Sequence, residues 1–255
     1  MQAAARIERI YRYPVKGLSA EGLSSTRLRV GRTLLADRLY AIENGPSGFD
    51  PAAPAYFPKQ RFLMLMRNER LARLNARLDE DTHVLSIELD GAIAARGSLR
   101  EPEGRAAVEG FLVDFCADEL RGPPKVLYGN GHSFSDVARK VVSIISLASL
   151  AEIERALGAT VDPLRFRANL YVGGWPAWHE LALVGHELRI GPTAKLKGVK
   201  RIQRCAATEV DPVTAARDLP IPKTLLRTFG HADCGLYAEV IADGEIAVGD
   251  AVEEN

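Results

Sequence analysis

The sequence predicts a mainly β protein with a few helices, an α+β arrangement in which a closed barrel or sandwich is favoured over an alternating α/β sheet. Many short apolar runs are separated by turn residues, whereas only three segments have a helical pattern. A chain of 255 residues can bury a core as one large domain or two small ones. The Gly-Pro-Pro sequence at 122–124 predicts a boundary, which gives domains at 1–124 and 125–255.

The first domain is expected to begin with strands and turns. An apolar run at 7–11 is stopped by Pro14, and a second run covers 34–43. A stretch rich in Gly, Pro and Ala at 43–58 predicts a long loop. The later elements are a helix at 67–80 from the spacing of Leu71, Leu74 and Leu78, a hairpin turning at Asp90 and Gly91, and an amphipathic helix at 103–120.

The second domain has a more regular pattern. A strand at 140–146 precedes a helix at 146–158, which Gly158 ends. Residues 164–172 alternate in polarity and predict a strand. The remaining elements are hairpins at 180–191, turning near Gly185, and at 237–252, turning at Asp243 and Gly244.

Composition and charge exclude several classes of protein. Hydrophobic residues make up 47% of the chain and charged residues 26%, which is ordinary for a globular protein. Because 33 basic residues balance 33 acidic ones, we expect no nucleic-acid partner. The N-terminus lacks a signal-peptide core, and no apolar stretch is long enough to span a bilayer. The three cysteines, Cys116, Cys205 and Cys234, are too few for a disulfide framework, which predicts a reducing compartment. Together these observations predict a cytoplasmic protein with no membrane association.

A row of polar side chains lies along the strand expected at 164–172. Alternation places Arg165, Arg167 and Asn169 on one face. This face is either solvated or a cradle for phosphate, because arginine forks bind phosphate oxygens in bidentate fashion.

Cys205 follows a basic run at 195–204. Positive charge favours the thiolate, the form that binds metals or attacks electrophiles, although a lone cysteine is more often a small buried apolar residue. Together with His231 and Cys234 it could form a three-ligand metal site. Support for this site is weak, because the sequence contains no CxxC pair.

Other polar groups have simpler interpretations. His132, Ser133 and Asp136 could form a nucleophilic set for a metal-free hydrolase, but they are too close in sequence for an ordinary triad. Lys16, Asp37, Arg38 and Arg61 are each consistent with surface charge.

Several of these segments occur together in one known family. The segments are YPVKG at 13–17, GRTLLADRLYAIE at 31–43, SIISLASL at 143–150, RFRAN at 165–169, RCAATEVDP at 204–212 and CGLYAEVIADGEIAVGDAV at 234–252. In this order and with these spacings, the chain resembles the MOSC family, named for the C-terminal domain of molybdenum cofactor sulfurase. The sulfurase parent also has a pyridoxal-phosphate domain, for which this chain has no room.

The resemblance implies a MOSC-type β-barrel beside a smaller N-terminal β-rich module, with molybdenum cofactor (molybdopterin) in the cleft between them. It implies that Cys205 is the metal ligand and catalytic residue. Gly17 stands where the family often has serine, and Gln203 replaces a small residue. The positions matching the family's cofactor-binding residues are Lys16, Arg38, Ser146, Arg167, Asn169 and Arg204.

The chain is similar to the amidoxime-reducing members of this family. That similarity implies an oxidoreductase that reduces small N-hydroxylated substrates with electrons from a separate donor protein. A different possibility is a non-catalytic carrier of molybdenum cofactor or of sulfur, as a persulfide on Cys205. The metal-free hydrolase is the third alternative.

Overall fold

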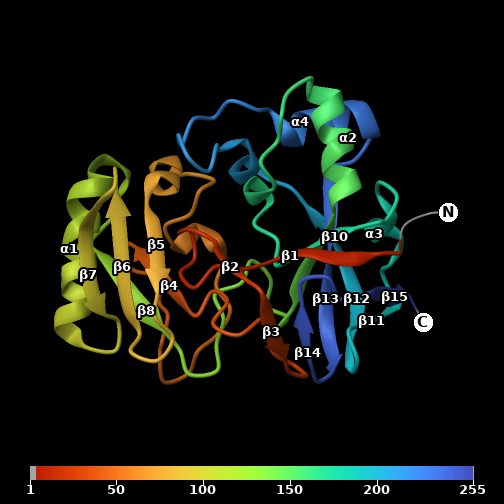
Figure 1. Ribbon diagram of the computed structural model, residues 1–255. Coiled ribbons are helices and arrows are strands. Elements are labelled where there is room, and N and C mark those ends of the chain that lie inside the picture. Colours follow the sequence, from red (N-terminus) through yellow and green to blue (C-terminus); the bar gives the residue numbers. More distant parts are fainter. Residues whose placement is uncertain (1–3, 255) are drawn as a thin grey trace.

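Strands predominate in the fold (Figure 1). The computed structural model describes residues 4–254 and contains four α-helices in this range. The predicted fold class is confirmed, because the chain forms a curled eight-stranded sheet beside a smaller N-terminal β-rich part. Within residues 4–254, no helix combines the length and apolar character needed to cross a bilayer. The helices are α1 (Pro102–Cys116), α2 (Leu147–Leu157), α3 (His179–Ala182) and α4 (Ile221–Phe229).

The strands of the described range form four sheets. In spatial order, the eight-stranded sheet consists of β15 (Val252–Glu254), β11 (Glu187–Ile190), β12 (Ala194–Gln203), β13 (Asp233–Ala242), β9 (Val142–Ser146), β10 (Leu170–Gly173), β1 (Arg6–Arg12) and β2 (Glu21–Leu23). The others are the pair β3 (Ser25–Leu28) and β14 (Gly244–Ala247), the pair β4 (Tyr40–Asn44) and β8 (Pro124–Tyr128), and the sheet of β5 (Asn75–Leu78), β6 (Val84–Leu89) and β7 (Ala92–Ser98).

The eight-stranded sheet takes strands from both ends of the chain. Strand β1 pairs antiparallel with β10, which pairs parallel with β9. All five residues of β9 are buried, as expected for a run of Val, Ser and Ile in a central strand. Helices α2 and α4 lie together above this sheet in Figure 1, and their Ile153 and Leu225 share one buried cluster. Residues far apart in sequence therefore form one core.

The N-terminal part has its own core. Helix α1 packs against β7 and β8, and its Val108, Leu112 and Phe115 share one buried cluster with Leu85 and Ile87 of β6. Strand β8, the first element after the predicted boundary, pairs with β4 of the first half. The division at residue 124 stays a prediction.

Elements specified by local pattern are confirmed. Helix α2 lies within its predicted segment, α1 starts one residue before its own and ends at Cys116, and Gly158 ends α2 in the left-handed conformation. Asp90 and Gly91 both have positive φ, which is typical of a type I′ turn between β6 and β7. The loop predicted at 43–58 contains no helix or strand after β4 ends.

The helix predicted at 67–80 is wrong. A short 3-10 turn at Glu69–Arg73 leads into strand β5. Leu71, Leu74 and Leu78 are buried nonetheless, because the turn and the strand direct all three into the core. Pairing of β5 with β6 overrides the weak helical preference of the segment.

The strand predicted at 164–172 is also wrong over its first half. Pro163–Phe166 form a 3-10 turn, and the strand begins only at Leu170. The Asp162 carboxylate accepts a hydrogen bond from the Leu164 N–H at 2.8 Å, which caps the turn. The chain then reverses at Arg167, whose φ is 51°.

Both hairpins predicted near the C-terminus have different partners. Residues 179–182 are helical, and β11 pairs with β12 instead. Strand β14 follows Asp243, as predicted, but pairs with β3 rather than with β13. In both cases the turn signal is present, and the choice of partner depends on tertiary contacts.

Helix α1 approaches β7 through two glycines. A Cβ on Gly97 would lie 2.5 Å from the Gly104 Cα, and one on Gly104 would overlap the Ser98 backbone. Gly110, on the same helix, has no neighbouring atom near its Cβ position and is exposed. Close packing at Gly104 therefore fixes the helix on the sheet.

We predict that Gly104→Ala lowers the free energy of unfolding by about 2 kcal/mol, because the methyl group overpacks a backbone contact. Gly110→Ala should leave stability unchanged or raise it by up to about 1 kcal/mol, since alanine favours a helix. Urea denaturation measures both variants. Equal effects would contradict the close contact between α1 and β7.

Candidate functional site

A cavity of about 110 Å³ lies where the two halves of the chain meet. The first half contributes Lys16, Asp37, Arg38 and Lys59, and the second half contributes Cys205, Asp136, the 165–169 segment and Arg204. From residues 4–254, six cationic side chains and two carboxylates line it, although the whole chain has no net charge. The cavity is therefore a local concentration of positive charge.

Lys16 is held at the cavity wall by a tight turn. Its backbone N–H donates to the Tyr40 carbonyl at 2.8 Å, and its Nζ donates to the Phe134 carbonyl at 2.8 Å and pairs with Asp136 at 2.5 Å. Burial lowers the pKa of Lys16, and Asp136 opposes that shift. The neighbouring Gly17 has φ 85°, and a Cβ there would lie 2.8 Å from a backbone oxygen. The turn thus requires glycine where the family often has serine.

Asp136 completes this cluster. Burial disfavours its carboxylate, but Lys16 and Lys59 outweigh burial and hold the pKa of Asp136 well below its usual range. The carboxylate therefore neutralises part of the cavity's positive charge.

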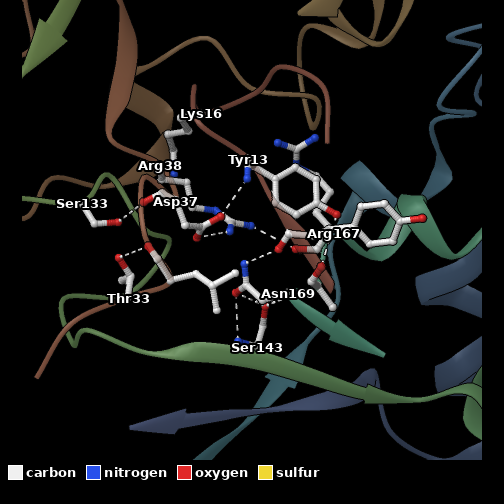
Figure 2. Close-up of polar contacts among 12 residues, drawn as sticks. Tyr13, Lys16, Thr33, Asp37, Arg38, Ser133, Ser143, Arg167 and Asn169 are labelled. Atoms are coloured by element: carbon white, nitrogen blue, oxygen red, sulfur yellow. Dashed lines mark hydrogen bonds and ion pairs between the residues drawn. The ribbon is translucent and has the colours of Figure 1, made fainter. Parts of the chain in front are cut away.

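Arg38 links the two halves. It pairs with Asp37 at 2.5 Å, and Asp37 also accepts from the Tyr13 N–H at 2.8 Å. The Arg38 Nη2 donates to the Arg167 carbonyl at 3.0 Å, as Figure 2 shows. Arg38 therefore fixes the turn that presents Arg167, and its own charge is already paired.

Arg167 has no carboxylate partner in the described part of the chain. Its guanidinium lies over the Tyr13 ring, 4.2 Å from the centroid (Figure 2). Within residues 4–254, its side chain makes no hydrogen bond or ion pair. Burial lowers the pKa of Arg167 to about 10, which still leaves it charged near neutral pH. A charged guanidinium without an acceptor at a cavity wall is a candidate anion site.

The predicted row of Arg165, Arg167 and Asn169 does not exist, because Arg165 lies in the 3-10 turn and not on a strand face. Arg165 pairs with Asp218 at 2.7 Å and with Asp211 at 2.8 Å. Although Arg165 lines the cavity, its charge is neutralised from outside it.

Asn169 is used in the fold. Its Oδ1 accepts from the Ser143 N–H and hydroxyl at 3.1 and 2.8 Å, and its Nδ2 donates to the Tyr11 carbonyl at 3.1 Å. The side chain thus joins β9 and β1 beside the cavity, with little capacity left for a ligand.

Cys205 follows β12 and is half-buried at the cavity. The Lys59 Nζ donates to its Sγ at 3.3 Å and lies 3.7 Å from Asp136. Burial works against the Lys59 charge, but Asp136 and Cys205 hold its pKa above the ordinary value. Sequence reasoning missed Lys59, whereas Arg61 is exposed and outside the cavity, in agreement with the surface charge expected there. The available signal was the position of Lys59 at the end of the long loop.

Arg204 lines the cavity and binds two backbone carbonyls beside it. Its Nε donates to the Cys234 carbonyl at 2.6 Å and its Nη1 to the Phe166 carbonyl at 2.8 Å. Its buried Nη2 has no hydrogen-bond partner in residues 4–254. Ser146 is fully buried, donates to the Pro176 carbonyl at 3.4 Å, and does not line the cavity. Arg204 therefore supports the turn before Arg167, whereas Ser146 lies outside the candidate site.

Two alternatives from the sequence find no support in the described part of the chain. No group of His, Cys, Asp and Glu suited to a metal ion occurs in residues 4–254, so Cys205, His231 and Cys234 do not form the three-ligand site. The Ser133 hydroxyl donates to the Asp37 carbonyl at 3.0 Å, and no hydrogen bond within this range joins it to His132. The nucleophilic set is therefore not assembled.

Comparison with known proteins covers both halves. The MOSC domain matches residues 124–253, and the MOSC N-terminal beta barrel domain matches residues 4–119. Mitochondrial amidoxime reducing component 2 of Bos taurus and of Rattus norvegicus are each 32% identical over 123 residues. Each match covers 44% of this chain and 36% of the relative, so it spans little more than a third of the relatives' length.

Two solved structures are also similar. The YUAD protein from Bacillus subtilis has 14% identity and a TM-score of 0.47, covering 99% of this chain and 96% of that one. YiiM from Geobacillus stearothermophilus has 17% identity and a TM-score of 0.36, covering 45% and 53%. At these TM-scores, neither structure informs the site.

We predict that native protein at pH 8 reacts with iodoacetamide at Cys205 at least roughly a hundredfold faster than at Cys116 or Cys234. Cys205 is half-buried at the cavity, whereas the other two are fully buried. Burial raises the pKa of Cys116 to about 11 and that of Cys234 to about 12, so both stay protonated. Peptide mass spectrometry over time measures the three rates. Comparable labelling of Cys116 would contradict the assigned environments.

Proposed function

The chain belongs to the MOSC family, and on that premise we propose that it binds molybdenum cofactor in the cavity that holds Arg167 and Cys205. The observation that carries the proposal is the charged Arg167 guanidinium without an acceptor in the described part of the chain, in the same cavity as a half-buried thiol. A phosphate-bearing cofactor with a thiolate-binding metal fits both groups.

The fit extends to the rest of the cavity. Arg165 and Arg38 already have carboxylate partners, which leaves Arg167, Arg204 and the lysines to offset the charge of the cofactor. Lys16 shares Asp136 with Lys59, so these two ammonium groups are only partly neutralised. An anionic ligand would therefore reduce the repulsion among the remaining cations.

Each group of the chain has a distinct proposed role. Arg167 binds phosphate oxygens, with Tyr13 fixing the plane of its guanidinium. Cys205 provides the thiolate for the metal, and the Lys59 ammonium stabilises negative charge on its sulfur. When bound, the cofactor supplies two-electron redox chemistry at molybdenum. Arg38 and Arg204 hold the backbone around Arg167 and are positioning residues.

We further propose that the reaction is reduction of an N-hydroxylated compound, in which two electrons and two protons convert the N–OH group to N–H and release water. The name of the relatives, amidoxime reducing component, supports this substrate class. The electrons would come from a separate donor protein. A cytoplasmic location remains a prediction, while the relatives are named mitochondrial.

A carrier function is the second candidate. The Lys59 ammonium beside Cys205 would also stabilise a persulfide, which the thiolate could form by taking the outer sulfur of a donor persulfide and releasing the donor as a thiol. Metal analysis combined with a reductase assay separates the two, because only the enzyme consumes an N-hydroxylated substrate.

Cys205→Ser should strongly reduce bound molybdenum, because an oxygen ligand matches a thiolate site poorly, while the half-buried position preserves the fold. Cys116→Ser is the matched control. It should leave metal content unchanged but lower stability, since Cys116 is buried in the core of the N-terminal part. Elemental analysis and thermal unfolding measure both variants. Metal loss in Cys116→Ser alone would make the ligand assignment wrong.

Arg167→Ala and Lys16→Ala should each weaken cofactor retention by about tenfold to a hundredfold, the equivalent of ~1.5–3 kcal/mol for a charge-assisted contact. The two losses should be coupled if both groups bind one anion. Fluorescence of the oxidised pterin measures retention, with Arg61→Ala as the control because its side chain is exposed and outside the cavity. Normal cofactor occupancy in both variants would contradict a cofactor-binding role for Arg167 and Lys16.

A further inference from the structure

A second pocket, of about 440 Å³, lies in the N-terminal part and shares no lining residue with the cavity around Cys205. Its polar lining consists of Tyr40, His83, Arg100, Arg105 and Tyr128, and no carboxylate of residues 4–254 lines it. Apolar side chains complete its walls. A pocket with two arginines and no acid is unexpected in a chain with equal numbers of acidic and basic residues.

The two arginines are fixed by backbone carbonyls rather than by acids. The Arg105 Nη1 donates to the carbonyls of Leu99 and Arg100 at 3.0 and 2.9 Å. The Arg100 Nη1 donates to the Asp81 carbonyl at 3.3 Å. Neither guanidinium has an ion pair within residues 4–254. Because a guanidinium carries five N–H donors, most of their donor capacity is left for a ligand.

The aromatic side of the pocket supplies a platform and a third donor. The rings of Tyr40 and Tyr128 lie 5.4 Å apart at 38°, and Tyr128 is 40% exposed. The Tyr40 hydroxyl lies 2.6 Å from the His83 Nδ1. Burial and the charge of Arg100 lower the pKa of His83, which favours the neutral ring, and we assign Nδ1 as the acceptor because the Tyr40 hydroxyl has no other hydrogen-bond partner within residues 4–254. The remaining ring proton is then on Nε2, as a donor.

The backbone holds His83 in this place. Its φ is 54°, which is uncommon for a residue other than glycine. The Leu99 N–H donates to its carbonyl at 2.9 Å and anchors the conformation beside Arg100. The imidazole and both guanidinium groups therefore belong to one fixed arrangement.

We propose that this pocket binds a small aromatic phosphate, with the ring against Tyr128 and the phosphate on Arg100 and Arg105. Planar guanidinium forks match phosphate oxygens, and several oxygens suit a set of two guanidinium groups and an imidazole N–H. An aromatic ring gains stacking energy against the accessible tyrosine. The site is independent of the proposed cofactor site, so either can fail without the other.

The test is a titration of ¹⁵N-labelled full-length protein with phenyl phosphate, followed by amide chemical shifts. Saturable shifts are expected at His83, Arg105 and Tyr128, whatever occurs at Lys16 and Arg167. Phenol and inorganic phosphate, each with half of the recognised chemistry, should bind at least about tenfold more weakly at this pocket. Shifts confined to the Lys16 and Arg167 cavity would overturn the proposal.

Variants test the assigned contacts. Arg100→Gln should weaken phenyl phosphate binding by about tenfold, and Tyr128→Leu by about fivefold, because each removes one recognised group. Both side chains are exposed, so the fold should persist, and unchanged amide shifts elsewhere verify it. Arg77→Gln, an exposed change on β5 outside the pocket, should bind like the wild type. Equal affinity of Arg100→Gln and wild type, or equal weakening by Arg77→Gln, would overturn the proposal.

Discussion

The pairing of β1 with β10 is the interaction on which the candidate site depends. It joins a strand from the start of the chain to one that follows the Arg167 turn. Reciprocal hydrogen bonds between the Tyr11 backbone and Asn169 extend the pairing to the edge of the cavity. Lys16 and Arg38 follow β1, so the same pairing brings their charges to Arg167 and Cys205. Neither half of the chain contains this cavity by itself.

Electrostatics determine what such a cavity can hold. Gathering cations in one place costs free energy unless carboxylates or a ligand offset the repulsion. Asp37 neutralises Arg38, and Asp136 forms ion pairs with both Lys16 and Lys59. Among the residues that the structure describes, the Arg167 side chain has no ion pair or hydrogen bond and lies over the face of Tyr13. The chain thus fixes positive charge in advance, which favours an anionic ligand over a neutral one.

The sequence predicts features that depend on local pattern and misses those that depend on distant contacts. The apolar run of β9 and the turn at Asp90 and Gly91 carry their own signals, and both are confirmed. The leucines at 71–78 fit a helix and a turn followed by a strand equally well, so only pairing with β6 decides between them. Lys59 and Arg204 have roles that arise from folding, because their partners lie far away in sequence.

The two halves of the chain together are proposed to bind a molybdenum-containing anionic cofactor. The most direct measurement is elemental analysis of the wild-type chain, purified from a host in which a resident molybdoenzyme is fully loaded. We expect close to one molybdenum per chain, with a matching amount of pterin released on denaturation. Absence of both metal and pterin from this chain, while the resident enzyme from the same cells carries them, would contradict it.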